Sequence, residues 1–257
     1  MAKVDIFKKI PKLDYTETAP EINTEEFIKV VESRRSVRVY TDEHIPEDVM
    51  HKCLDLALLA PNSSNLQAWE FYWVKDQHKK EKLVKYCLSQ PAARTAPELI
   101  VAVARTDTWD IRSKEMISLL KQNSPKPPKA ALQYYKKIVP LAYNQGPLNV
   151  FGYIKQIVVA LRGLKTPTPR EPGSESDMKV WAHKSTALAC ENLMLAFRAF
   201  GYDSCPMEGM DSKRIKNLLG LPSKAYITMV ISAGKRAPNG VYGPRIRFDR
   251  NKFIKTI

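Results

Sequence analysis

Two apolar stretches, far apart in the sequence, constrain the fold of this chain most strongly. Residues 98–104 read Glu-Leu-Ile-Val-Ala-Val-Ala, a branched, apolar run typical of a central strand. Residues 226–233 form a second run of this kind, and the aromatic-rich run at 70–74 predicts a further strand. Helical patterns occupy much of the remaining chain, so the sequence predicts a fold with both helices and strands.

Capping residues and apolar periodicity mark the helices. Asn23 is a capping residue with a glutamate three positions on, and Pro46 suits the first turn of the next helix. Gly201 is a fitting C-cap for a long helix. The helices are expected over residues 24–34, 46–60, 76–89, 178–200 and 211–220. Irregular structure is expected for an arm over 1–22, loops over 61–68 and 166–177, a turn-rich link over 203–210 and an extended basic tail from 234.

Positive charge is the most unusual property of the composition. The length of 257 residues suits one large domain, and the net charge is +14. Such a surplus favours nucleic acid, an anionic membrane surface or phosphorylated small molecules as partners, although a solvated basic surface without a partner is equally consistent with it. Residues 111–180 contain 12 basic and 4 acidic side chains, so +8 of the surplus lies in this segment.

The basic segment over residues 111–180 is expected to hold two or three short helices. One of them spans residues 150–164, where apolar side chains at helical spacing stand beside Lys155 and Arg162. The apolar positions are Phe151, Ile154, Ile157, Val158 and Leu161. A basic amphipathic helix can lie on a membrane surface or cover a site for an anionic ligand. We expect this one to pack on its own domain.

Several kinds of site are not indicated by the sequence. The four cysteines form no CxxC pair, and the histidines lack the spacing of metal ligands, so neither a disulfide framework nor a metal site is expected. No GxGxxG, P-loop or GxSxG motif occurs. The N-terminus lacks the apolar run of a signal peptide, and no apolar stretch reaches the length of a bilayer span, so we expect a cytoplasmic protein.

Two polar stretches together indicate a ligand site. Residues 33–40 place three arginines and Ser36 where a helix ends, and residues 60–69 place several hydrogen-bonding side chains between a helix and a strand. Arginine suits phosphate because its planar fork donates two parallel hydrogen bonds and remains charged at any working pH. We therefore expect a pocket for a phosphorylated, flat ligand with polar edges. Cations at a helix C-terminus, which relieve the helix dipole, are the alternative explanation for one or two of the arginines.

These motifs, in their order, resemble those of the FMN-dependent nitroreductase family. The resemblance rests on residues 34–40, 60–71 and 192–211, and it covers about residues 24–110 and 178–248. It implies an α+β fold, a three-layer α/β/α sandwich with a mostly antiparallel central sheet, in a domain-exchanged homodimer. The chain is then a single domain over residues 1–257, with an insertion at about 111–180 and a C-terminal extension from about 235 that joins the partner's sheet.

Carried over residue by residue, the resemblance implies an FMN site at the subunit interface. Contacts to the phosphate, ribityl chain and pyrimidine edge fall on Arg34, Arg35, Ser36 and Arg38. Contacts from the other subunit fall on Pro61, Asn62, Ser63 and Asn65. The segment along the ring, with a backbone N–H facing the flavin N5, is Pro206, Met207, Glu208 and Gly209. The basic pair that closes on the phosphate is Arg245 and Arg247, and further polar contacts fall on Gln90 and Ser185, the latter at a position where a glutamine is common in the family.

By this resemblance the protein transfers hydride from NADH or NADPH through FMN to a nitroaromatic, quinone or related acceptor in a ping-pong cycle. An FMN phosphate carries about two negative charges, which several arginines suit. No side-chain base is required, because the cofactor performs the difficult step. Glu208 either orients a substrate near the flavin N5 or is only a charged turn residue.

Two alternatives remain for the function. A relative of the same fold could oxidise a substrate or fragment the flavin itself, and the long insertion could build the pocket for such a reaction. A protein of another class could use the basic segment to bind nucleic acid or a membrane surface. We expect a second subunit and a small-molecule acceptor as partners, without nucleic acid and without a membrane.

Overall fold

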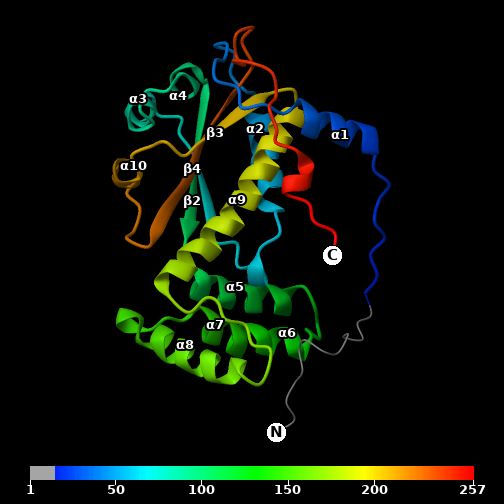
Figure 1. The fold of residues 1–257 in the computed structure, drawn as a ribbon, viewed down its shortest axis with the longest axis vertical. Coiled ribbons are helices and arrows are strands. Elements are labelled where there is room, and N and C mark those ends of the chain that lie inside the picture. Colours follow the sequence, from blue (N-terminus) through cyan, green and yellow to red (C-terminus); the bar gives the residue numbers. More distant parts are fainter. Residues whose placement is uncertain (1–14) are drawn as a thin grey trace.

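An antiparallel sheet crosses the centre of the molecule in the computed structural model, which describes residues 15–257 (Figure 1). Within these residues the sheet has four strands in the order β1-β2-β4-β3. They are β1 (Trp69–Trp73), β2 (Glu98–Arg105), β3 (Asp203–Met207) and β4 (Ala225–Gly234). The strands predicted at 70–74, 98–104 and 226–233 are thereby confirmed. The part of the expected arm over residues 1–14 lies outside the described residues, and residues 15–23 have no regular structure.

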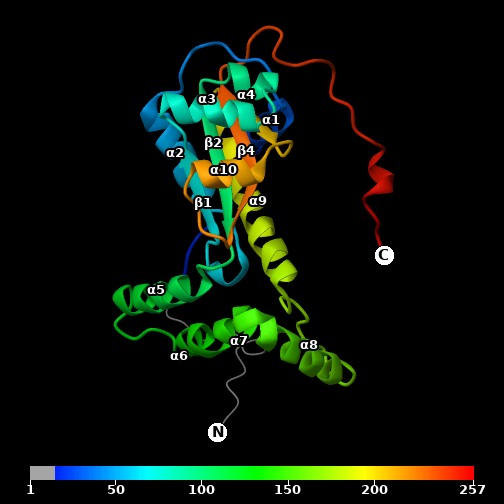
Figure 2. The ribbon, with the colours of Figure 1, turned by 90° about the vertical axis from the view of Figure 1, so that its left-hand side faces the viewer.

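The side chains of β2 alternate between two hydrophobic cores, one on each face of the sheet. Leu99 and Val101 pack with the layer of α3, α4 and α10, whereas Ile100 and Ala102 pack with the layer of α2 and α9. These helices are α2 (Glu47–Leu58), α3 (Gln77–Tyr86), α4 (Pro91–Thr95), α9 (Glu175–Ala199) and α10 (Ser212–Leu218). The predicted three-layer α/β/α sandwich with an antiparallel sheet is therefore confirmed, and Figure 2 shows helices on both faces.

Side-chain caps set the starts of the helices. The Asn23 side chain accepts from the Glu26 N–H and begins α1 (Thr24–Ser33), as predicted. The long helix α9 begins at Glu175, three residues earlier than expected, because the Ser174 hydroxyl accepts from the Asp177 N–H. The expected helix over 76–89 ends at Tyr86, and a separate short helix, α4, follows it.

The prediction of a turn-rich link over 203–210 is wrong for its first half. Asp, Ser and Pro in this segment gave a turn signal, yet residues 203–207 form β3, paired with β4 from Asp203–Gly234 to Met207–Val230. β3 is the last strand in the sheet order and, among the described residues, is bridged on its outer side only at Ser204, by Ser36. This edge position tolerates Pro206, whose nitrogen cannot donate to a ladder.

The basic segment forms helices at one end of the sandwich, and they are more numerous than the two or three that were expected (Figures 1 and 2). They are α5 (Trp109–Gln122), α6 (Lys129–Gln133), a π-helical turn (Tyr134–Ile138), α7 (Val139–Tyr143) and α8 (Val150–Gly163). A cluster that includes Val139, Tyr143 and Trp181 packs these helices against α9 and the end of β2. The insertion is therefore anchored mainly through α7.

The expectation that the helix over 150–164 packs its apolar side on its own domain is wrong for this chain. Along α8 only Gly152 is buried, and the apolar side chains at helical spacing are exposed. The pattern predicted the helix correctly, because periodicity reports which residues share a face. It does not report what covers that face. No helix in the described part of the chain is long and apolar enough to cross a bilayer.

Phe197 is the largest side chain that α9 buries completely, at 0% exposure against the sheet. We expect Phe197→Ala to lower the free energy of unfolding by about 3–5 kcal/mol, because it leaves a cavity in a close-packed core. Chemical denaturation measures this change. Phe200→Ala is the matched control, since Phe200 caps the same helix at 39% exposure and its loss leaves no enclosed cavity. Equal effects of the two substitutions would contradict the assigned packing.

Candidate functional site

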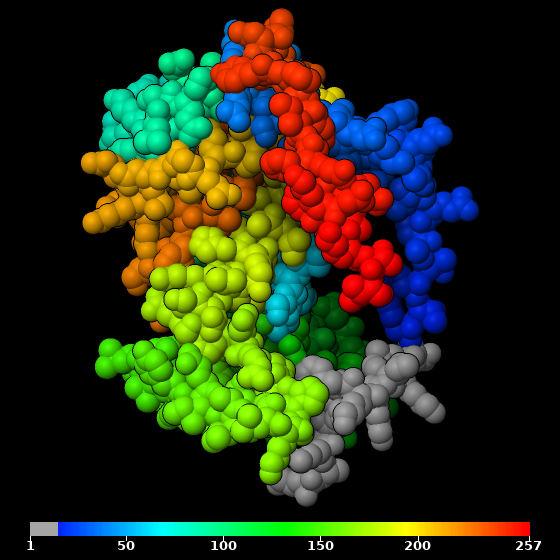
Figure 3. Space-filling model, viewed as in Figure 1, coloured from blue at the N-terminus to red at the C-terminus, as the bar shows by residue number. Residues whose placement is uncertain are grey.

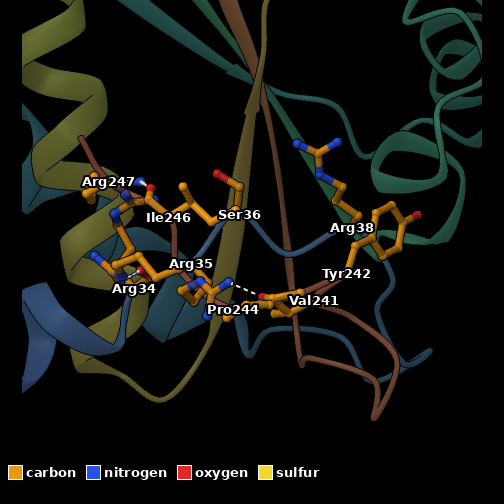
Figure 4. Close-up of a pocket in the computed structure, with 11 residues that line it drawn as sticks. Arg34, Arg35, Ser36, Arg38, Val241, Tyr242, Pro244, Ile246 and Arg247 are labelled. Atoms are coloured by element: carbon orange, nitrogen blue, oxygen red, sulfur yellow. Dashed lines mark hydrogen bonds between the residues drawn. The ribbon is translucent and has the colours of Figure 1, made fainter.

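A pocket of about 430 Å³ lies where the α1–α2 connection meets the C-terminal tail, at the end of the sheet away from the insertion (Figures 1 and 4). Its walls come from residues 34–38 and 241–247. The lining residues are Arg34, Arg35, Ser36, Arg38, Val241, Tyr242, Gly243, Pro244, Arg245, Ile246 and Arg247. Six of the residues predicted to contact a ligand are thereby brought together in one chain.

Backbone pairing holds the first wall of the pocket. The Val37 N–H donates to the Ser204 carbonyl at 3.2 Å, and the Arg38 N–H donates to the Gly240 carbonyl at 2.7 Å. This extended segment alternates, so that Val37 is fully buried in the core while Ser36 and Arg38 are exposed at the pocket. The alternation explains why the third arginine, Arg38, lies at the pocket. The stabilising effect of cations at a helix C-terminus does not explain its position.

The second wall is tied to the first by guanidinium groups. Arg245 Nη2 donates to the carbonyls of Glu32 and Arg34, at 2.6 and 2.5 Å. In the opposite direction, Arg35 Nη2 donates to the Gly243 carbonyl at 2.6 Å. Tyr242 was not predicted to belong to the site, yet its ring centroid lies 5.7 Å from the Arg38 guanidinium. The sequence signal that could have identified Tyr242 is an aromatic residue next to Gly243 in a basic tail.

The positive charge of the pocket is nearly uncompensated within the described chain. Among residues 15–257, Glu191 is the only carboxylate within 4.0 Å of the five pocket arginines, at 3.9 Å from Arg34 Nε. By contrast, Arg236 just outside the pocket pairs at 2.6 Å with Asp203, which is only 4% exposed. The pocket thus concentrates planar, permanently charged donors with a single, distant carboxylate, which is the chemistry that recognises a phosphate.

The end of β3 and the short connection before α10 contain the four residues predicted to lie along the ring: Pro206, Met207, Glu208 and Gly209. Gln90 Nε2 donates to the Gly209 carbonyl at 2.8 Å and fixes this connection to the start of α4. Glu208 is exposed, and its negative charge acts on His183 of α9. Burial lowers the pKa of His183, and the negative charge of Glu208 opposes that shift.

Pro61, Asn62, Ser63 and Asn65 lie away from the arginine pocket, next to the insertion (Figure 1). Asn62 Oδ1 accepts from the Gln67 N–H at 2.8 Å, and the Ser63 hydroxyl lies 2.9 Å from the Tyr143 hydroxyl. Within one chain, this loop therefore lies apart from the pocket arginines. Ser185 is also not presented to the pocket: it is buried, and its hydroxyl donates to the Trp181 carbonyl at 3.1 Å.

A second pocket of about 900 Å³ separates the insertion from the end of the sheet. Its walls combine residues after β2, the α7–α8 connection, the start of α9 and Lys224. The buried polar atoms of Gln145 and Asn149, which both line it, have no hydrogen-bond partner within the described residues. The sequence did not indicate this pocket, because its lining residues form no motif and come together only through the fold.

An antiparallel sheet between two helical layers, with a strongly basic pocket at one end, defines the chain as an α/β/α sandwich protein. The sequence model of the Nitroreductase family matches residues 31–235, which is most of the chain. The chain therefore belongs to the nitroreductase family, and the resemblance seen in its motifs is confirmed.

Individual relatives agree with this assignment. The chain is 27% identical over 204 residues to protein DrgA of Synechocystis sp., covering 79% of this chain and 80% of the relative. It is 27% identical over 217 residues to an NADH dehydrogenase of Thermus thermophilus, covering 84% and 90%. Among solved structures, an Exiguobacterium sibiricum nitroreductase in complex with FMN shares the fold with a TM-score of 0.67 at 24% identity, over 95% of this chain and 100% of that one.

Cys205 lies on β3 beside the arginine pocket, and all four cysteines are free and buried. Burial raises the pKa of Cys53, Cys87 and Cys190 to about 12 and also raises that of Cys205, although Arg38 and Ser36 oppose the shift there. A raised pKa leaves less thiolate at a given pH, so we expect alkylation of the native protein near neutral pH to be at least about 100-fold slower than after unfolding. A thiol titration in both states measures this. Fast native labelling at Cys205 would contradict its burial.

Proposed function

We propose that this protein is an FMN-dependent oxidoreductase that transfers hydride from NADH or NADPH to a nitroaromatic, quinone or related acceptor in a ping-pong cycle. The observation that carries the proposal is the pocket of five arginines with one distant carboxylate. A phosphate of about two negative charges would neutralise that cluster through charge-assisted hydrogen bonds. FMN in the related Exiguobacterium structure, and the NADH dehydrogenase activity in the name of the Thermus relative, support the choice of cofactor and reductant.

The residues of the two pocket walls would hold FMN by its charged end. Arg34, Arg35 and Ser36 are placed to bind the phosphate and ribityl chain, and Arg245 and Arg247 close over them from the tail. Arg38 stands apart from this group in Figure 4, beside Tyr242. We assign it to the pyrimidine edge, where a cation favours the reduced form of a flavin.

The segment Pro206, Met207, Glu208 and Gly209 would lie along the ring. When bound, FMN supplies the hydride chemistry, so the chain needs only to bind it, orient it and leave one face open. Gln90 serves orientation, because it fixes the Gly209 carbonyl and with it the direction of the neighbouring peptide groups. We assign no proton transfer to Glu208, which is exposed and can contact a substrate.

The other half of the site would come from a second subunit. In one chain the loop with Pro61, Asn62, Ser63 and Asn65 is held next to the insertion, away from the arginines. A homodimer that brings this loop to the partner's arginine pocket would complete the FMN site. The Ser185 hydroxyl already donates to a carbonyl within α9. Ser185 would therefore contribute to the packing of the protein interior and would not contact FMN directly.

The absorption spectrum of the purified protein tests the proposed activity. We expect a yellow protein, or one that becomes yellow on reconstitution with FMN, and we expect anaerobic NADH or NADPH to bleach it. Acceptor turnover should then restore the oxidised spectrum. A protein that cannot be reconstituted contradicts the FMN site. Retained flavin that neither nucleotide bleaches contradicts the reductase cycle and favours the substrate-oxidising alternative.

Removal of one pocket arginine tests the assigned phosphate site. We expect Arg34→Ala and Arg247→Ala each to weaken FMN binding by about 10- to 100-fold, because a hydrogen bond between charged groups contributes about 1.5–3 kcal/mol. Fluorescence titration of FMN measures the affinity. Lys121→Ala on α5 is the matched control, since it removes one exposed positive charge remote from the pocket. If all three variants bind FMN alike, the cofactor lies elsewhere.

A further inference from the structure

Helix α8 contacts the rest of its chain through its small and polar side. Gly152 is buried, and Gln156 Nε2 donates to the Gly173 carbonyl at 2.8 Å. Gly163 lies under Arg170, whose Nη2 is 2.8 Å from the position that a Cβ would take. Lys155 donates to the Ala142 carbonyl. These contacts fix the rotation of the helix about its own axis.

The opposite side of α8 is apolar and exposed. Seven large side chains on this side are between 52 and 81% exposed: Phe151, Tyr153, Ile154, Ile157, Val158, Leu161 and Leu164. They span a wide arc at 100° per residue, so they form one continuous stripe, which we call the α8 stripe. None of the described residues covers it. In Figures 1 and 3 α8 lies at the outer edge of the molecule, at the end remote from the arginine pocket. A continuous exposed apolar surface of this kind marks an interaction site.

The charge around the stripe specifies its partner. No Asp or Glu occurs between residues 116 and 170, whereas this stretch carries nine Lys and Arg. Arg162 and Lys165 are exposed at the end of α8, and Lys136 and Lys137 are exposed on the neighbouring π-helical turn. An apolar stripe in a stretch of chain whose only charged side chains are cations fits a surface that offers acyl chains beneath anionic headgroups. Contact between the stripes of two copies would bring like charges together.

We propose that α8 is a docking helix that lies in the plane of an anionic membrane surface. The α8 stripe enters the boundary between headgroups and acyl chains, and Arg162 and Lys165 contact lipid phosphates. The helix is too short to span the bilayer, and its inner side remains attached to the loop around Gly173. This inference goes beyond the proposed redox activity and does not depend on it, and it replaces the expectation that no membrane takes part.

Flotation of the full-length protein with lipid vesicles tests this proposal. We expect binding to vesicles that contain phosphatidylglycerol, little binding to phosphatidylcholine alone, and a decrease with added salt. The double variant Ile154→Asp with Leu161→Asp should bind at least about 10-fold more weakly, because two apolar side chains no longer enter the lipid. The variant Arg162→Gln with Lys165→Gln keeps the stripe, so it should lose affinity only for the anionic vesicles.

Leu88→Asp is the matched control for the aspartate substitutions. Leu88 is 69% exposed on another face of the molecule, and its φ of 58° is one that Asp tolerates. We expect it to bind vesicles like the unaltered protein. Circular dichroism and thermal unfolding confirm that each variant is folded.

Three results would overturn the proposal. The unaltered protein could fail to bind phosphatidylglycerol vesicles, or the stripe variant could bind them as well as Leu88→Asp does. Alternatively, light scattering without lipid could show that the stripe variant alone changes the oligomeric mass, which would make α8 a contact between copies of this chain.

Discussion

The buried carboxylate of Asp203 joins the parts of the fold on which the arginine pocket depends. It accepts from Arg236 Nη2 and Nε, at 2.6 and 3.1 Å, and from Arg198 Nη1 at 3.1 Å. These groups come from the start of β3, the chain after β4 and the end of α9. A buried carboxylate with two guanidinium partners is balanced, whereas loss of either partner would leave a costly buried charge. The pocket wall at Ser36 pairs directly with the next residue, Ser204, so this cluster sets where the arginines stand.

The arginines of the chain therefore serve two different purposes. Arg198 and Arg236 are matched to a carboxylate and hold the scaffold together. Those that line the pocket donate to backbone carbonyls or to no group among the described residues, and they keep their full charge for a ligand. The positive residues of the insertion form a third population, around an apolar stripe instead of a pocket. The net charge of +14 therefore includes three groups of basic residues, each in a different local environment.

Sequence reasoning succeeded where local patterns decide the structure. The branched run of β2, the cap at Asn23 and the arginines after α1 were all predictable, because each is specified by neighbouring residues. β3 was missed because its pairing with β4 overrides the turn preference of Asp203 and Pro206. The second pocket and the outward side of α8 could not be predicted, since both depend on which distant segments meet. The loop at Asn62 does not meet the arginines within one chain, so its assignment to the FMN site stays a prediction.

The crossed contacts between Arg245, Arg35 and the backbone link ligand binding to the order of the tail. Each tail residue held in place loses conformational entropy, which these hydrogen bonds offset in part, and a ligand in the pocket would offset more of it. By reciprocity, whatever fixes the tail also raises affinity for the ligand, and the ligand in turn fixes the tail. Residues beyond Arg247 are exposed and stand away from the sandwich in Figure 2. A neighbour that captures this tail would therefore act as an effector of the pocket without touching the ligand.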